Sequence, residues 1–256
     1  MQECAVAEMA GGSVGYFSTA APHRGESPNE DSAGLFDLGG GRGVLLVADG
    51  VGGHPQGPRA SALAVEHMDT ALKAVNGKPS LRDAILDGFE RANRAILDLG
   101  VGAATTLAAI EVRDDLIRPF HAGDSAVLVT GQRGRLKLLT VSHSPVGYAV
   151  EAGVISEGEA LHHEDRNVVS NLVGSAAMRI ELGAELPLDA HDTVVIGTDG
   201  LFDNLSTDEI IDIVRAGPIE AAARALREGC ERRMNEPRNS EPSKPDDLTF
   251  LVYRRA

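Results

Sequence analysis

Short apolar runs recur along the chain and are separated by turns rich in glycine and polar residues. Runs of this length, with β-branched residues and turn signals at both ends, are typical of strands. Several runs are joined by only a few residues, which indicates antiparallel neighbours. The expected strands cover residues 13–20, 44–48, 106–112, 117–122, 126–130, 136–141, 193–197 and 248–253.

Four other segments repeat their apolar residues with the period of an α-helix. They cover residues 58–75, 79–99 and 218–234, together with a shorter helix that begins near Thr207, where acids occupy the first turn. Strands and helices come in blocks and do not alternate strictly. This arrangement predicts an α+β fold with antiparallel sheets in the core and helices outside.

The domain organisation follows from the same pattern. Residues 1–12 are mostly small and show no clear pattern of a helix or strand. We therefore expect a flexible N-terminus followed by one domain over residues 13–256. Within this domain, residues 142–175 are polar and poor in strands. This segment is predicted to form a flap or small subdomain.

Composition and charge argue against several classes of protein. The net charge of −14 argues against a nucleic acid or an anionic membrane as partner. Two cysteines cannot build a disulfide framework, no apolar run is long enough to span a bilayer, and the N-terminus lacks the pattern of a secretory signal. We therefore expect a cytoplasmic protein.

Acidic residues stand where apolar runs begin or end. The stretch LLVADGVGGH (45–54) places Asp49 directly after a run, and TVVIGTDGLF (193–202) repeats this pattern with Asp199. Asp124 lies between two runs. Further acids precede a run: Glu30 and Asp31 in NEDS, and Asp246 and Asp247 in PDDLTF.

In antiparallel sheets the end of one strand lies beside the start of its neighbour, so these acids are expected to converge at one edge. Carboxylates brought so close repel one another unless cations lie between them. Oxygen ligands without a histidine or cysteine cluster favour Mg²⁺ or Mn²⁺ over zinc, and Gly50 lets a backbone carbonyl approach such an ion. The alternative for each aspartate alone is a turn or cap residue.

Other motifs of catalysis are incomplete or missing. GVGG after a strand suggests a dinucleotide-binding loop, but Pro55 stands where the third glycine is needed. The chain has no P-loop, no nucleophile elbow of the G-x-S-x-G type and no H-E-x-x-H pattern. Neither cysteine has an arginine six positions later, so the cysteine-phosphatase signature is missing as well.

Taken in order, seven stretches resemble the metal-dependent type 2C protein serine/threonine phosphatases (the PPM family), in their bacterial form. They cover nearly the whole chain from about residue 13 to residue 253. The stretches are NEDS (29–32), VADGVGGHPQGPRAS (47–61), GAATTLAAI (102–110), HAGDSAVLV (121–129), TVSHSPV (140–146), GTDGLFDNL (197–205) and DDLTFLV (246–252).

The resemblance implies a four-layer α-β-β-α sandwich of two mainly antiparallel sheets, with a centre for two Mg²⁺ or Mn²⁺ ions at one edge. Carried over residue by residue, Asp49 would bridge both ions, and Asp199 and Asp246 would complete the first. The carbonyl of Gly50 would hold the second ion, helped by Glu30 and by Asp31 through water. Asp124 with Asp199 would match a weaker third-metal site.

The activity implied is hydrolysis of phosphoserine and phosphothreonine in proteins, by a hydroxide shared between two ions. Its partners would be a phosphorylated protein and a cognate serine/threonine kinase in a signalling system, and we expect a monomer. Arg24 is the nearest candidate for the phosphate-binding arginine, although it lies six residues before Glu30. His54 is a candidate for the general acid, with loop packing as the alternative.

The chain also departs from the family pattern. Val51 stands where eukaryotic members often carry a histidine, Ala126 replaces an arginine, Ser142 an aspartate and Asp247 an asparagine. None of these changes removes an expected ligand. Two rival functions stay open: a catalytically weak regulatory relative that binds phosphoproteins, and an acidic ion-binding or interaction domain without chemistry.

Overall fold

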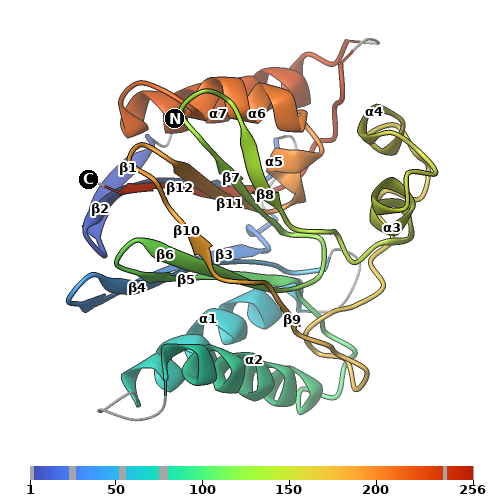
Figure 1. Ribbon diagram of the computed structural model, residues 1–256. Helices are drawn as coiled ribbons and strands as arrows, with labels where there is room; N and C mark the ends of the chain where they lie inside the picture. Colours follow the sequence, from blue (N-terminus) through green and yellow to red (C-terminus); the bar gives the residue numbers. More distant parts are fainter. Residues whose placement is uncertain (1–2, 23–26, 52–55, 75–79, 239–240, 256) are drawn as a thin grey trace.

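The computed structural model describes residues 3–22, 27–51, 56–74, 80–238 and 241–255. Two six-stranded sheets lie face to face in the middle of the molecule (Figure 1). Every strand pair is antiparallel. The short connections read from the sequence are therefore confirmed as antiparallel turns.

The first sheet holds both ends of the described chain. Its strands, in spatial order, are β1 (Ala5–Met9), β2 (Gly12–Thr19), β12 (Leu248–Arg255), β11 (Thr193–Gly197), β7 (Ala126–Thr130) and β8 (Leu136–Leu139). The pairing of β12 with β2 joins residues that are more than 200 positions apart in the sequence.

The second sheet is built mainly from two hairpins. Its strands, in spatial order, are β10 (Leu186–Pro187), β6 (Leu116–Ala122), β5 (Leu107–Arg113), β4 (Arg42–Asp49) and β3 (Asp31–Gly39), and β9 (Glu181–Leu182) also pairs with β6. The turn between β3 and β4 lies in the glycine-rich stretch 39–43.

Helices cover the outer faces of both sheets, which confirms the four-layer α-β-β-α sandwich (Figure 1). On the second sheet lie α1 (Gly57–Lys73) and α2 (Leu81–Leu97); on the first lie α5 (Asp199–Phe202), α6 (Thr207–Val214) and α7 (Ile219–Asn235). Two short helices, α3 (Pro145–Glu151) and α4 (Glu157–Ala160), lie to one side of the layers. None of the described helices is long and apolar enough to cross a membrane.

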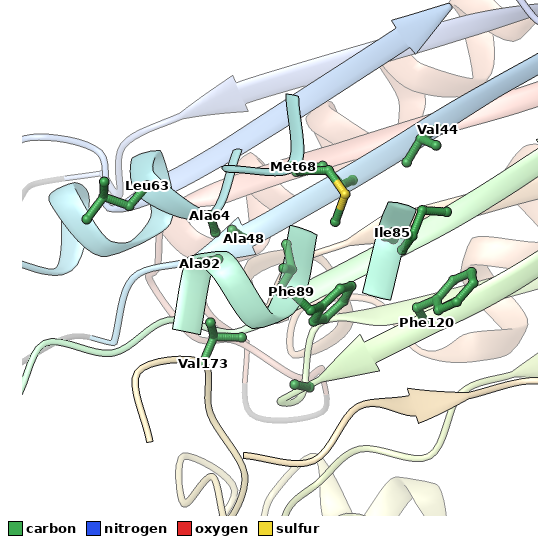
Figure 2. Close-up of a cluster of buried hydrophobic side chains, with 14 of the residues drawn as sticks. Val44, Ala48, Leu63, Ala64, Met68, Ile85, Phe89, Ala92, Phe120 and Val173 are labelled. Atoms are coloured by element: carbon green, nitrogen blue, oxygen red, sulfur yellow. The ribbon is translucent and has the colours of Figure 1, made fainter. Parts of the chain in front are cut away.

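The unbroken apolar run of β4 is explained by burial on both faces. Side chains of a strand alternate between the two faces of its sheet. Val44, Leu46 and Ala48 pack under α1 and α2, whereas Leu45 and Val47 pack against the other sheet. Figure 2 shows the outer layer of this core, where Val44 and Ala48 lie near side chains from both helices.

Two of the longer strands were not expected from the sequence. β1 and β3 are edge strands, and their half-exposed residues include charged and glycine positions that weaken the apolar pattern. β1 also places residues 5–9 in the first sheet, within the segment for which flexibility was expected. The segment 142–175 contains α3 and α4 and no strand, in line with its polar composition.

Replacing a buried side chain between α2 and the second sheet by a smaller one should destabilise the protein strongly. Phe89 is fully buried, and a Phe89→Ala variant leaves a cavity that the rigid sheet cannot fill. We expect its free energy of unfolding in urea to fall by about 3–5 kcal/mol. The matched control, Glu90→Ala, changes an exposed residue of the same helix and should stay within about 0.5 kcal/mol. Equal effects of the two changes would contradict this packing.

Candidate metal centre

The hairpin of β3 and β4 brings the first two acids together. Asp31 begins β3, Asp49 ends β4, and the two residues lie opposite each other in the register of the pair. The backbone of Asp49 is held from the other side: its N–H donates to Thr106 Oγ1 at 3.0 Å, and its carbonyl accepts from Thr106 N at 2.8 Å and Thr105 Oγ1 at 2.7 Å. The strand end is therefore fixed by two threonines just before β5.

Asp199 and Asp246 come from the first sheet. β11 and β12 run antiparallel, so the residue that follows the end of β11 lies near those that precede β12. The contact is close: a Cβ atom at Gly200 would lie 1.9 Å from the carbonyl oxygen of Asp247. Only glycine permits this approach, which brings Asp199 to the start of β12.

Hydrogen bonds tie the two sheets together at this end. Thr198 Oγ1, after β11, donates to Asp31 Oδ2 at 2.9 Å. Asp247 accepts from Glu30 N at 2.6 Å and from Ala21 N at 2.7 Å. Asp247 is buried, and it sets the position of the segment that carries Glu30.

Two oxygen donors converge at the N-terminal end of α1. The N–H of Gly50 donates to the carbonyl of Glu30 at 3.0 Å. A Cβ atom at Gly57 would lie 2.7 Å from Glu30 Oε1 and 3.2 Å from the carbonyl oxygen of Gly50. The Glu30 carboxylate and the Gly50 carbonyl thus face the same small space, which is the pair expected for one ion.

Asp124 reaches the same region from the loop between β6 and β7. Its neighbour Ser125 shares a hydrogen bond of 2.6 Å with Thr106 Oγ1, next to the backbone of Asp49. Before it, the N–H of Gly123 donates to His143 Nδ1 at 3.1 Å. The loop is therefore anchored on both sides of Asp124.

Burial and mutual repulsion raise the pKa values of four of these carboxyl groups. For Asp49, burial is the larger cause, and the charges of Asp199, Asp31, Asp124 and Asp246 add to it. Burial, with the charges of Asp199 and Asp203, raises the pKa of Asp124 to about 7. The pKa values of Asp31 and Asp246 are raised by burial and by the charge of Asp199. Asp31, Asp49, Asp124 and Asp246 are thus all under the influence of the charge of Asp199.

Two further residues belong to this cluster and were not assigned from the sequence. Burial, followed by the charge of Asp199, raises the pKa of Asp203 to about 6. Lys244 Nζ forms ion pairs with Asp199, with Asp203 Oδ2 at 3.1 Å and with Asp246 Oδ2 at 3.1 Å. Asp203 lies in a stretch used for the resemblance. Lys244 stands in a polar loop, where its proximity to acids distant in sequence gives no local signal.

The donor set fits divalent cations. Asp31 Oδ1 and Asp199 Oδ1 are buried and have no hydrogen-bond partner among the described residues. Buried oxygens of this kind are costly unless a cation approaches them. Carboxylate and carbonyl oxygens are the ligands that Mg²⁺ and Mn²⁺ prefer. Arg24 and His54 lie outside the described residues.

A second group of potential ligands lies beside Asp124. Atoms of His121, His143 and Glu181 lie within 4.8 Å of one another. The N–H of Gly123 can only donate, so His143 Nδ1 accepts and His143 Nε2 carries the proton toward Glu181 Oε2, 3.0 Å away. The two imidazole rings are stacked, with centroids 4.3 Å apart. This group is better described as a hydrogen-bonded support for the loop of Asp124.

A cavity of about 520 Å³ opens beside the acids. Its lining includes Asp124, Asp199 and Asp203, together with Val146 of α3 and Leu161 after α4. The segment 142–175 therefore borders the candidate centre.

The raised pKa values predict how stability depends on pH when divalent ions are removed. Between about pH 4 and about pH 7 the folded protein retains protons on Asp124 and Asp203 that the unfolded chain has lost, so stability falls as pH rises. With EDTA present, the melting temperature should be lower at about pH 7.5 than at about pH 5, and excess Mg²⁺ should restore it. Asp124→Asn should show a smaller fall. An unchanged pH dependence in this variant would refute the assignment to Asp124.

Proteins of known structure share this fold. The structure of the S. agalactiae serine/threonine phosphatase superposes with a TM-score of 0.80 at 27% identity, covering 95% of this chain and 99% of that one. The catalytic domain of the protein phosphatase PstP, solved in complex with two manganese ions, superposes with a TM-score of 0.73 at 23% identity, covering 94% and 97%. The second likeness concerns the fold alone.

The sequence comparisons give the family. A putative protein phosphatase 2C-type of Streptococcus pyogenes serotype M6 is 33% identical over 199 residues, and the match covers 73% of this chain and 79% of the relative. The family model described as protein phosphatase 2C matches residues 20–236. The resemblance and the prediction of a protein phosphatase are thus confirmed at the level of the family: the chain belongs to the protein phosphatase 2C family.

Proposed function

We propose that this chain hydrolyses phosphoserine and phosphothreonine in proteins with the help of Mg²⁺ or Mn²⁺. The observation that carries the proposal is the convergence of Asp49, Asp199 and Asp246 from two different sheets. The carbonyl of Gly50 and the carboxylate of Glu30 face a second space beside Asp49. Membership of the phosphatase 2C family supports this assignment of the centre.

In this proposal Asp49, Asp199 and Asp246 would hold one ion, and Asp49, the carbonyl of Gly50 and Glu30 would hold the other. Asp31 would assist the second ion through water, and Asp124 with Asp199 would offer a weaker third site. Bound divalent ions supply an activated water at neutral pH and neutralise charge on the phosphoryl oxygens. Cations held among the acids would lower the raised pKa values of Asp31, Asp49, Asp124 and Asp246.

The chain's own residues position the reaction. Thr105 and Thr106 hold the backbone of Asp49, so the carboxylate is aimed before the substrate arrives. The cavity bordered by α3 and α4 leads to the acids, and residues 142–175 act as a flap beside the phosphoprotein. Arg24 as phosphate anchor and His54 as general acid complete the proposal from the family resemblance.

The signalling role, the location and the oligomeric state are also proposed from the family resemblance. Relatives are named as serine/threonine phosphatases, among them those of Listeria species. We infer that this chain reverses the action of a cognate serine/threonine kinase in the cytoplasm, as a monomer. The regulatory and ion-binding alternatives gain no support, because the acids at the expected ligand positions are intact.

Loss of Asp49 should abolish turnover without unfolding the protein. Asp49→Asn removes the carboxylate shared by both ions and keeps the size of the side chain. We expect Mn²⁺-dependent hydrolysis of p-nitrophenyl phosphate and of phosphothreonine peptides to fall by about a thousandfold or more. Circular dichroism should show that the fold is retained.

The matched control is Asp37→Asn, an exposed aspartate at the far end of the same hairpin. An amide oxygen can still accept the hydrogen bond that Asp37 receives from Gly39 N, so activity should not change. If the unaltered protein shows no Mn²⁺-dependent hydrolysis and EDTA has no effect, the proposed function is wrong. Activity of Asp49→Asn near that of the unaltered chain would refute the assigned ligands.

A further inference from the structure

Lys244 places a positive charge inside the acidic cluster. Its side chain is only 15% exposed, and its ammonium group pairs with Asp199, Asp203 and Asp246. In the described part of the chain, the ion pairs recorded for these three aspartates all involve Lys244. The charge of Lys244 also lowers the pKa of Asp124, against the larger effect of burial. The ammonium group thus lies against Asp199, Asp203 and Asp246.

Hydrogen bonds hold the backbone of Lys244 in place, in addition to the ion pairs of its side chain. Lys244 N donates to Asn204 Oδ1 at 2.9 Å, and Asn204 Nδ2 donates to the carbonyl of Lys244 at 2.8 Å. Asn204 is fully buried and also donates to the carbonyl of Gly200, next to Asp199. Arg233 of α7 donates to the carbonyl of Asn204 at 2.6 Å. These bonds distinguish Lys244 from a surface lysine that pairs with acids by chance.

The balance of negative and positive charges in the cluster indicates what Lys244 does there. Six aspartates share the cluster: Asp31, Asp49, Asp124, Asp199, Asp203 and Asp246. The proposed centre also uses Glu30, which makes seven carboxylates. When all seven are ionised, two divalent ions would offset four of the seven negative charges. Lys244 offsets a fifth beside Asp199, Asp203 and Asp246. A third divalent ion at that side would have to share Asp199 with the ammonium group, and like charges repel strongly where water is scarce.

We propose that Lys244 is a built-in cation of this centre, which occupies the side formed by Asp199 and Asp203 and weakens the binding of a further divalent ion there. The inference builds on the proposed function, because it concerns the same metal centre. Its second consequence is that Lys244 limits repulsion among the acids when divalent ions are removed.

The test measures metal binding directly. Lys244→Gln keeps a polar side chain of similar reach but removes the charge. Titration of EDTA-treated and dialysed protein with Mn²⁺ in a calorimeter should show one more bound ion, or an affinity at the weakest site raised by about tenfold or more. The melting temperature of the ion-depleted variant should be lower than that of the unaltered chain, and Mn²⁺ should remove the difference.

Lys137→Gln is the matched control. Lys137 is 17% exposed and is likewise paired with two aspartates, Asp189 and Asp192, on another part of the first sheet. Its loss should lower the melting temperature but leave the affinity for Mn²⁺ and the number of ions unchanged. Lys244→Arg, which keeps the charge, should bind Mn²⁺ as the unaltered chain does. If Lys244→Gln folds only with Mn²⁺ present and Lys244→Arg folds without it, the inference is supported.

The outcomes separate this inference from the proposed function. Equal affinity and equal ion number in Lys244→Gln and the unaltered chain would overturn the inference and leave the phosphatase proposal standing. Binding by Lys244→Gln alone would support the inference in a stronger form, in which the lysine blocks the centre. The proposed function and the inference would both fail if neither protein bound Mn²⁺ and the unaltered chain did not hydrolyse p-nitrophenyl phosphate.

Discussion

Repulsion between carboxylates is the constraint that shapes one end of this molecule. Buried acids raise one another's pKa, and ionised carboxylates in a medium of low dielectric constant push apart unless positive charge lies among them. The fold counters this tendency with bonds to the backbone. Asp49 is held by Thr105 and Thr106, and the loop of Asp124 is held by Ser125 and His143.

The two sheets are needed together for the centre to exist. Asp31 and Asp49 belong to one sheet, whereas Asp199 and Asp246 belong to the ends of strands in the other. Hydrogen bonds from Thr198 to Asp31 and from Glu30 to Asp247 cross between them. The same packing that buries the apolar faces of the sheets therefore sets the distance between the acids, so stability of the sandwich and geometry of the centre depend on each other.

Much of the fold could be read from the apolar pattern because several of the strands are buried on both faces. β4, β7 and β11 have nearly every residue buried, and their runs are unmistakable in the sequence. β3 could not be found in this way, since an edge strand exposes polar and glycine positions that break the pattern. The short helix α5 was missed for another reason: four residues are too few to show a helical period.

The sequence by itself determined the positions of the acids along the chain, because an aspartate at the end of an apolar run is a local feature that needs no partner to be recognised. It also determined the antiparallel connections, since a turn of a few residues permits no other. Only the tertiary structure decided that Asp203 and Lys244 join these acids. The position of Lys244 depends on Asn204, which binds the loop before β12 to the segment after α5. A contact between residues 40 positions apart has no periodic signal in the chain, and it arises only when the first sheet and α7 are packed.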